Sequence, residues 1–242
     1  MKQTIILIFL SITLWSCSSK EDQIIRQTIS AHGGEAYKDM HVTFDFRGMH
    51  YDFTKNGGLY SYQRIQNDSL GNVISDILNN ETFTRTINGE VQYLPDSMAS
   101  KYSNSVNSVA YFFMLPDGLN DPAVNKEVTG TVKIKGQSYH QLKVWFDEQG
   151  GGKDHQDIFM FWINEKTNLI DYLAYSYETS GGGVRFREVI ERHQVGEFTF
   201  QDYNNYGFED AEYLLSDLPL ALEDGSLPLL SEIRNENIQL LK

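Results

Sequence analysis

The chain has 242 residues, 40% of them hydrophobic and 13% aromatic, and its 33 acidic against 20 basic side chains give a net charge of −13. This apolar and aromatic content indicates a folded body and excludes a disordered stalk. The excess of negative charge disfavours binding to nucleic acid or to anionic lipid head groups, so we expect no nucleic-acid partner. No heptads, solenoid repeats or low-complexity linkers occur, and one domain over residues 23–242 is the simplest division.

Residues 1–16 have the features of a signal peptide, with Lys2 as a basic start before an apolar stretch. The stretch has about eleven residues, too few to span a bilayer, which needs roughly 20. It ends in Leu14-Trp15-Ser16-Cys17, which resembles the bacterial lipobox, where the chain is cut before a diacylated cysteine. We therefore expect Cys17 to be lipidated and to anchor the protein in a membrane. The alternative is an incidental thiol at the end of an ordinary secretory signal.

Cys17 is the only cysteine, so it has no disulfide partner within the chain. Residues 17–22 are interpreted as the lipidated cysteine and a short acidic tether. Lys20-Glu21-Asp22 resembles the export signal of Bacteroidetes surface lipoproteins; the alternative is a helix start, where acidic side chains are favourable. These features predict an outer-membrane lipoprotein in the envelope of a Gram-negative bacterium, on either the outer or the inner face of that membrane.

A short helix is predicted around residues 24–29 and ends at His32-Gly33-Gly34. The apolar period then changes to two, and the apolar set of residues 42–46 has the opposite parity to that of residues 49–53. A change of parity across Gly48 indicates a bulge, a bend or a break between two strands. Hairpin turns are predicted at Asn56-Gly57-Gly58 and Asn88-Gly89.

An amphipathic helix is predicted between two groups of strands. Its apolar stripe consists of Met98, Tyr102, Val106, Val109 and Phe113. Further strands are predicted over residues 131–135, 139–146, 158–163, 169–177, 184–192 and 197–203.

Short connections between these strands require antiparallel pairing. The predicted class is therefore mainly antiparallel β with a few helices (α+β). We expect a strongly curved or unclosed barrel-like sheet, covered by the inserted helix and by a helical C-terminal segment over residues 210–242.

Residues 158–163, IFMFWI, have no polar position, so both faces of this strand must be covered. Phe159, Phe161 and Trp162, together with Phe113 of the inserted helix, are candidates for lining an apolar ligand site. The alternative is that all four belong to an ordinary core.

The loop over residues 147–157 contains most of the suggestive polar chemistry. Asp154, His155 and Asp157 are candidates for an acid and base pair, because a neighbouring carboxylate raises the pKa of a histidine. Asp147, Asp154 and Asp157 could instead hold a hard cation such as calcium. The third interpretation is a polar hairpin loop whose aspartates bind their own backbone.

Arg185 and Arg187 alternate with apolar residues on a predicted strand and share one face, where they could clamp a carboxylate or a phosphate. The alternative is cross-strand pairing with acidic neighbours. The sequence has no Gly-x-Ser-x-Gly, His-Glu-x-x-His, P-loop or Rossmann pattern, and we expect no cofactor.

Four stretches together resemble an uncharacterised family of Bacteroidetes lipoproteins, a domain of unknown function. They are residues 31–34 (AHGG), 111–122 (YFFMLPDGLNDP), 150–179 and 181–206. The family has no established activity, so the resemblance implies relatives and no reaction. The order of elements is also similar to the lipoprotein-carrier fold of the LolA and LolB type, a curved unclosed barrel that holds acyl chains.

The sequence thus predicts a membrane-anchored, non-enzymatic binding module for a lipid or other hydrophobic molecule, with any protein partner unknown. One alternative is an envelope hydrolase or metal-binding protein that uses the loop of Asp154, His155 and Asp157. The other is a surface module that binds a protein or a glycan.

Overall fold

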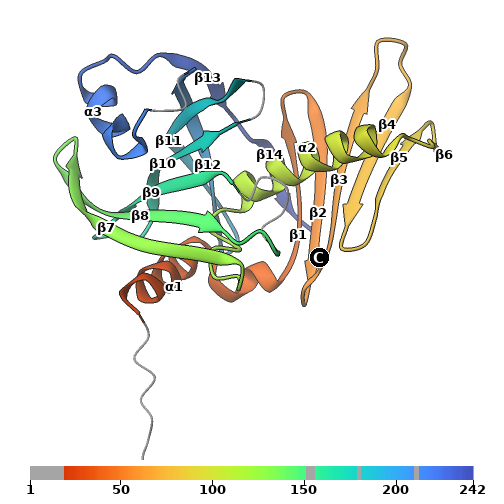
Figure 1. Ribbon diagram of the computed structural model, residues 1–242. Coiled ribbons are helices and arrows are strands. Elements are labelled where there is room, and N and C mark those ends of the chain that lie inside the picture. The colour runs from red at the N-terminus through yellow and green to blue at the C-terminus, as the bar shows by residue number, and fades with distance from the viewer. Residues whose placement is uncertain (1–18, 151–155, 179–180, 210–212, 242) are drawn as a thin grey trace, which may run out of the picture.

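The computed structural model describes residues 19–150, 156–178, 181–209 and 213–241, which form two antiparallel sheets and three α-helices (Figure 1). Sheet A has the order β14-β1-β2-β3-β4-β5-β6 and sheet B the order β13-β12-β11-β10-β9-β8-β7. The predicted class, mainly antiparallel β with a few helices, is confirmed. In the described part of the chain both sheets stay open, so their strands do not close into a barrel.

The strands of sheet A are β1 (Asp39–Phe46), β2 (Met49–Asn56), β3 (Leu59–Asn67), β4 (Val73–Asn79), β5 (Phe83–Ile87), β6 (Glu90–Val91) and β14 (Glu236–Leu240). Those of sheet B are β7 (Val124–Ile134), β8 (Gln137–Phe146), β9 (Ile158–Asn164), β10 (Ile170–Tyr177), β11 (Gly183–Val195), β12 (Phe198–Phe208) and β13 (Leu229–Ile233). The helices are α1 (Lys20–His32), α2 (Asp96–Met114) and α3 (Leu218–Glu223), with 3₁₀ turns η1 (Gly34–Lys38) and η3 (Leu215–Asp217). Among the described residues, no helix combines the length and the apolar character needed to cross a membrane.

Helix α1 begins directly after the predicted anchor segment. The Ser19 hydroxyl accepts a hydrogen bond from the Asp22 backbone N–H at 3.1 Å and caps the helix. Lys20, Glu21 and Asp22 therefore lie in its first turn, as in the helix-start alternative, and the acidic side chains face the positive end of the helix dipole. The predicted signal peptide and Cys17 lie outside the described residues.

The change of parity across Gly48 is explained by a tight hairpin. Arg47 and Gly48 both have positive φ angles, 52° and 72°, and connect β1 to β2. The two central residues of a two-residue hairpin turn need such angles to match the twist of the strands. The turn reverses the chain, and the apolar side chains on both strands then reach the same core.

The C-terminal segment differs from the predicted helical cover. Within residues 213–241 the helical elements are η3 and α3, and the chain then forms β13 on sheet B and β14 on sheet A. Gly225 and Pro228 follow α3 and end its helical path, because a positive φ and a missing N–H both oppose continuation. The two strands then pair with β12 and β1, whose edges would otherwise expose unpaired backbone groups.

The two sheets are joined where β13 passes into β14. The Asn235 backbone N–H donates to the Asp202 carboxylate at 2.9 Å, and the Asn235 amide donates to the Gln201 carbonyl at 3.0 Å. Arg234 beside it forms an ion pair with Glu191 at 3.0 Å. This network fixes the point at which the chain leaves one sheet for the other.

Helix α2 runs across sheet A and ends beside sheet B (Figure 1). Phe113 stacks between Phe44 and Phe200, with ring centroids 3.7 and 4.4 Å apart. The buried Asp76 of β4 also accepts hydrogen bonds from Arg64 and Arg85, at distances from 2.6 to 3.2 Å. Arg64 in turn reaches Ser105 of α2, so this polar network holds the helix on the sheet.

Both faces of the apolar strand β9 are covered, as its sequence requires. Phe159, Phe161 and Ile163 pack with α1 and the residues after α2. Met160 and Trp162 pack on the opposite face with the segment of η3 and α3. Sheet B therefore lies between two layers. One of its faces packs on α1 and the end of α2, and the other packs on η3 and α3.

Candidate functional site

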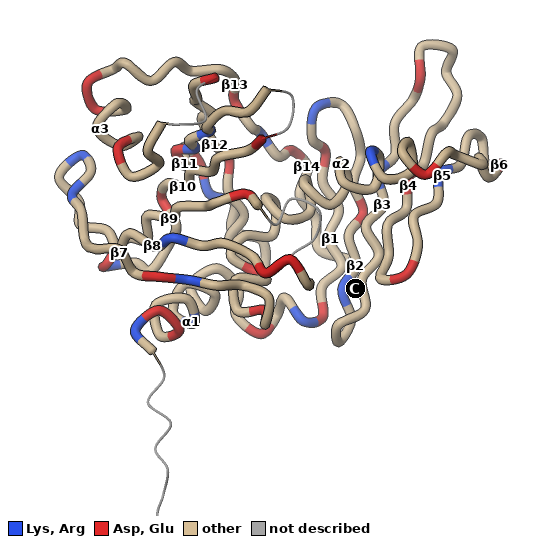
Figure 2. Tube along the Cα trace, viewed as in Figure 1, with Lys and Arg blue, Asp and Glu red and all other residues tan. Residues whose placement is uncertain are grey.

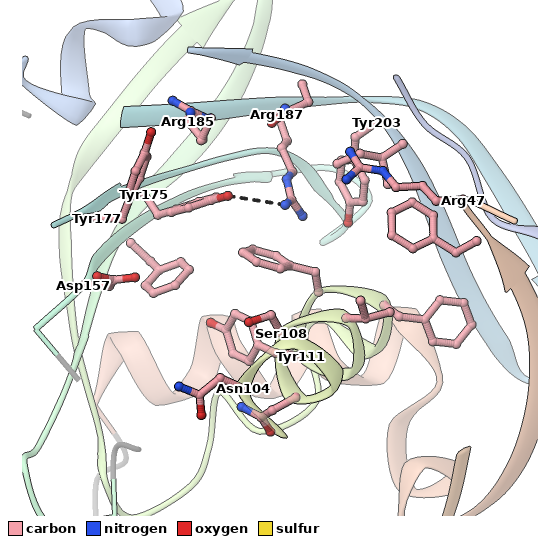
Figure 3. A pocket seen from close by; sticks show the side chains of 18 of the residues that line it. Arg47, Asn104, Ser108, Tyr111, Asp157, Tyr175, Tyr177, Arg185, Arg187 and Tyr203 are labelled. Carbon is pink, nitrogen blue, oxygen red and sulfur yellow. Dashed lines mark hydrogen bonds between the residues drawn. The ribbon is translucent and has the colours of Figure 1, made fainter. Parts of the chain in front are cut away.

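A cleft of about 860 Å³ lies between α2 and the face of sheet B that looks toward it (Figure 3). This volume falls within the range of about 300–1,000 Å³ that is typical of small-molecule sites. Asn104, Ser108, Tyr111 and Phe112 line it from α2, because residues three, four and seven or eight positions apart share one helix face. The opposite wall comes from β9, β10, β11 and β12.

Aromatic rings form the apolar part of the cleft. The Tyr111 ring lies 5.5 Å from Phe159 and 6.3 Å from Phe146, measured between centroids. Phe112 lies 5.2 Å from Tyr175, which stacks at 5.4 Å on Phe159. Rings at these distances give an apolar surface with fixed positions, suited to the body of a hydrophobic ligand.

Arg187 of β11 brings a positive charge into this apolar surface. Its side chain is only 8% exposed, and its guanidinium carbon lies 3.7 Å from the centroid of the Phe112 ring. The guanidinium donates a long hydrogen bond, 3.4 Å, to the Tyr175 hydroxyl. The Arg187 Nε is buried and has no hydrogen-bond partner among the described residues. Figure 3 shows the guanidinium pointing between Tyr175 and Tyr203 toward α2.

The alternation of β11 explains this orientation. Arg185 and Arg187 lie on the face toward the cleft, whereas Phe186 and Glu188 lie on the other face, where Glu188 forms an ion pair with Lys135. The guanidinium carbon of Arg185 lies 4.7 Å from the centroid of the Tyr177 ring, and the guanidinium donates a hydrogen bond to the Val184 carbonyl. The face shared by the two arginines thus reaches the cleft, as the strand pattern indicated.

Further charged groups line the cleft beside these arginines. Arg47, in the turn between β1 and β2, is exposed and lies on the side of Arg187 opposite to Arg185 (Figure 3). Asp157 and Glu209 also line the cleft. Acidic residues are spread along the whole trace (Figure 2), so the three arginines form a local exception in a chain of net charge −13.

Two tyrosines of the cleft, Tyr111 and Tyr203, are not poised for proton transfer. Burial raises the pKa of Tyr111 and of Tyr203 well above the usual value of a phenol, although the charge of Arg187 opposes the shift in both. Both hydroxyls therefore stay neutral near physiological pH. The Tyr111 hydroxyl is buried without a hydrogen-bond partner in the described ranges.

The residues singled out from the sequence fall in different places. Phe113 and Phe159 line the cleft, and so does Asp157. Phe161 is fully buried in the core, and Trp162 lies on the far face of sheet B, 5.4 Å from Phe186.

Among the other candidates in this loop, Asp147 does not line the cleft. Asp147 is exposed and accepts a hydrogen bond from Asn125 at 2.7 Å. Asp154 and His155 lie outside the described residues, and so does Cys17, so the acid and base pair and the cation site have no described geometry.

Several residues of the cleft were missed by the sequence analysis: Arg47, Tyr111, Phe112, Tyr175 and Tyr203. A signal existed for two of them. Tyr111 and Phe112 lie off the apolar stripe of α2, so the helix ends with apolar side chains all round, which indicates contact with a second layer.

One other cluster of the described residues has side chains of the kind that bind metal ions. It consists of Glu191, His193 and Asp202, whose potential ligand atoms lie within 4.8 Å of one another. The Arg234 guanidinium already lies 3.0 Å from Glu191 and 3.7 Å from Asp202. Asp202 also pairs with His193 at 3.0 Å. These contacts account for the cluster as part of the junction between the sheets.

Comparison with solved structures shows the fold. A LolA superfamily protein from Nitrosomonas europaea superposes with a TM-score of 0.50 and 6% identity, over 93% of this chain and 95% of that one. A domain from Vibrio parahaemolyticus assigned to outer membrane lipoprotein sorting gives 0.48, with 9% identity over 92% and 93%. A DUF1329 family protein from Desulfovibrio piger gives 0.46, with 8% identity over 92% and 94%.

The sequence comparisons place the chain among relatives without assigning an activity. No curated protein matches it. One family model matches residues 2–235, nearly the whole chain, and its description gives no function. The protein therefore belongs to the family of unknown function DUF6503.

Proposed function

We propose that this protein is a membrane-anchored envelope lipoprotein that binds a lipid or another hydrophobic molecule in the cleft between α2 and sheet B. The observation that carries the proposal is the cleft itself, about 860 Å³ with rings of Tyr111, Phe112, Phe146 and Phe159 along its walls. Burying apolar ligand surface against such walls stabilises a complex by roughly 25 cal/mol per Å².

The fold supports this proposal. The chain shares its overall architecture with a LolA superfamily protein. By analogy with the LolA-type fold, we propose that the curved open sheet holds an apolar ligand in this cleft. Membership in DUF6503 adds no activity. The polar groups that line the cleft are arginines, amides, tyrosines, one serine and two carboxylates.

The anchor is part of the proposal and rests on the sequence. Lipidation of Cys17 would hold the protein at the envelope, because two or more acyl chains give stable attachment. A Cys17→Ala variant should move from the membrane fraction to the soluble fraction. Protease added to intact cells then tests surface exposure separately: digestion supports the outer face, and protection supports the inner face.

Ligand binding in the cleft can be tested by filling it from α2. Ser108 lies exposed on the cleft side of the helix, so Ser108→Trp places a large ring in the cleft without disturbing the core. Titration with a neutral fluorescent apolar probe such as N-phenyl-1-naphthylamine should show saturable binding to the wild type and at least about tenfold weaker binding to the variant.

Lys101→Trp is the matched control, because Lys101 is an exposed residue of α2 that does not line the cleft. It should bind the probe like the wild type. Equal binding by all three proteins would show that the probe binds elsewhere and would contradict the proposal.

A further inference from the structure

We infer that the ligand of the cleft is an amphiphile with one acidic head group, a carboxylate or a phosphodiester, and that Arg187 binds this head group. The inference rests on the proposed function and adds the chemical class of the ligand. It starts from an unusual feature of Arg187: a guanidinium that is nearly buried and has no acidic partner in the described part of the chain.

Four other arginines of the protein have carboxylate partners. Arg64 and Arg85 both pair with Asp76 at 2.6 Å, Arg192 pairs with Asp171, and Arg234 pairs with Glu191 at 3.0 Å. Arg187 is as buried as the first two, at 8% exposed, yet no described carboxylate forms an ion pair with it. An arginine stays charged at any physiological pH, so its burial without a counter-ion costs free energy.

The groups around Arg187 compensate for this cost only in part. The Phe112 ring at 3.7 Å and the more distant rings of Tyr175 and Tyr203, at 5.6 and 5.8 Å, give cation–π stabilisation. The Tyr175 hydroxyl accepts one long hydrogen bond, and the Nε–H donates to nothing described. The rings hold the guanidinium in place, and the end of the side chain points toward α2 across the cleft (Figure 3).

The surroundings also select the shape and charge of the ligand. Arg187 lies beside the aromatic walls. A ligand whose head group binds Arg187 would therefore have its apolar part in contact with Phe112, Phe159 and Tyr111. Arg185 and Arg47 lie on its two sides and reinforce the positive potential (Figure 3). Asp157 and Glu209 line the same cleft and disfavour ligands with several negative charges.

The test compares ligands that share one acyl chain and differ in the head group. Binding of palmitate, palmitoyl lysophosphatidylglycerol and hexadecanol is measured by displacement of a fluorescent probe, with acetate as the head group alone. The wild type should bind one of the acidic amphiphiles about 10- to 100-fold more tightly than hexadecanol, the range expected for a hydrogen bond to a charged group. Preference for palmitate or for the lysolipid identifies the head group.

Arg187→Gln should abolish this preference, so that the acidic amphiphiles bind the variant no more tightly than hexadecanol does. Arg192→Gln is the matched control, since it removes the same charge from the same strand at a residue that does not line the cleft. The Arg187→Gln variant should also melt at the same temperature as the ligand-free wild type or higher, because it removes an unpaired buried charge.

Several results would overturn the inference. If hexadecanol and the acidic amphiphiles bind the wild type equally, the head-group inference fails while the proposed function stands. If none of the amphiphiles binds, both fail. Acetate binding as tight as palmitate would show an anion site without a lipid role, and strong destabilisation of Arg187→Gln would show a structural role for the guanidinium.

Discussion

His32 makes the stability of this protein depend on pH in the acidic range. It lies in the last turn of α1, fully buried, and its Nδ1–H donates to the Thr28 carbonyl at 3.0 Å. Its Nε2 is buried without a partner in the described ranges. Burial lowers the pKa of His32 from 6.5 to about 4, and the positive charge of Arg192 adds to the shift.

The folded protein therefore favours neutral His32, whereas the unfolded chain takes up a proton below pH 6.5. The stabilisation is fully present above pH 6.5 and is lost as the pH falls toward 4. A shift of about 2.5 pKa units corresponds to about 3 kcal/mol of unfolding free energy, at 1.36 kcal/mol per unit. Between pH 7 and pH 4.5 the expected loss is about 2 kcal/mol.

Urea denaturation of the wild type and of His32→Phe at several pH values isolates this contribution. Phenylalanine keeps an aromatic ring but has no group that titrates. When the pH is lowered from 7 to 4.5, the unfolding free energy of the wild type should therefore fall by about 2 kcal/mol more than that of the variant. His50→Gln is the control, because the His50 side chain is 48% exposed. A difference between wild type and His32→Phe that stays constant with pH would refute the reasoning.

Two further predictions concern the frame of the cleft. Asp76→Asn leaves Arg64 and Arg85 without a buried counter-charge and should lower the free energy of unfolding by about 3–5 kcal/mol, whereas the exposed Asp217→Asn should change it by less than about 0.5 kcal/mol. Equal effects in urea denaturation would mean that the network contributes nothing. A Cβ at Gly207 would lie 2.4 Å from the Val184 carbonyl oxygen, so Gly207→Ala should cost about 1–3 kcal/mol. Gly130→Ala, with open space at the same position, is its control, and a similarly small loss in both would contradict the predicted clash.

Local periodicity predicted the elements well. The apolar stripe that includes Val106 and Phe113 indicated α2. The change of parity across Gly48 left a bulge, a bend or a break between two strands open, and the structure shows the break. The division into two sheets was beyond the same reasoning. It depends on pairing between distant segments, such as Val42 of β1 with Leu240 of β14, and no local pattern records which edge a C-terminal strand will join.

Strand alternation predicted which side chains of a strand share a face, and this is the part of the candidate site that the sequence could predict. Arg185 and Arg187 share a face because the period of a strand is two, and that face reaches the cleft. The same rule separates Phe161 from Trp162, which must point to opposite faces. Phe112 and Tyr175 join the site through the docking of α2 on sheet B, a tertiary contact that the sequence does not reveal.

The central claim, that the cleft holds an acidic amphiphile, is tested most directly by native mass spectrometry of the protein released from its own membranes under mild conditions. The wild type should carry additional mass that dissociates as one anionic lipid, and this mass should be absent from Ser108→Trp and retained by Lys101→Trp. A wild-type protein that always appears at the mass of its acylated polypeptide alone, or a lipid that stays bound when the cleft is filled, would contradict the account.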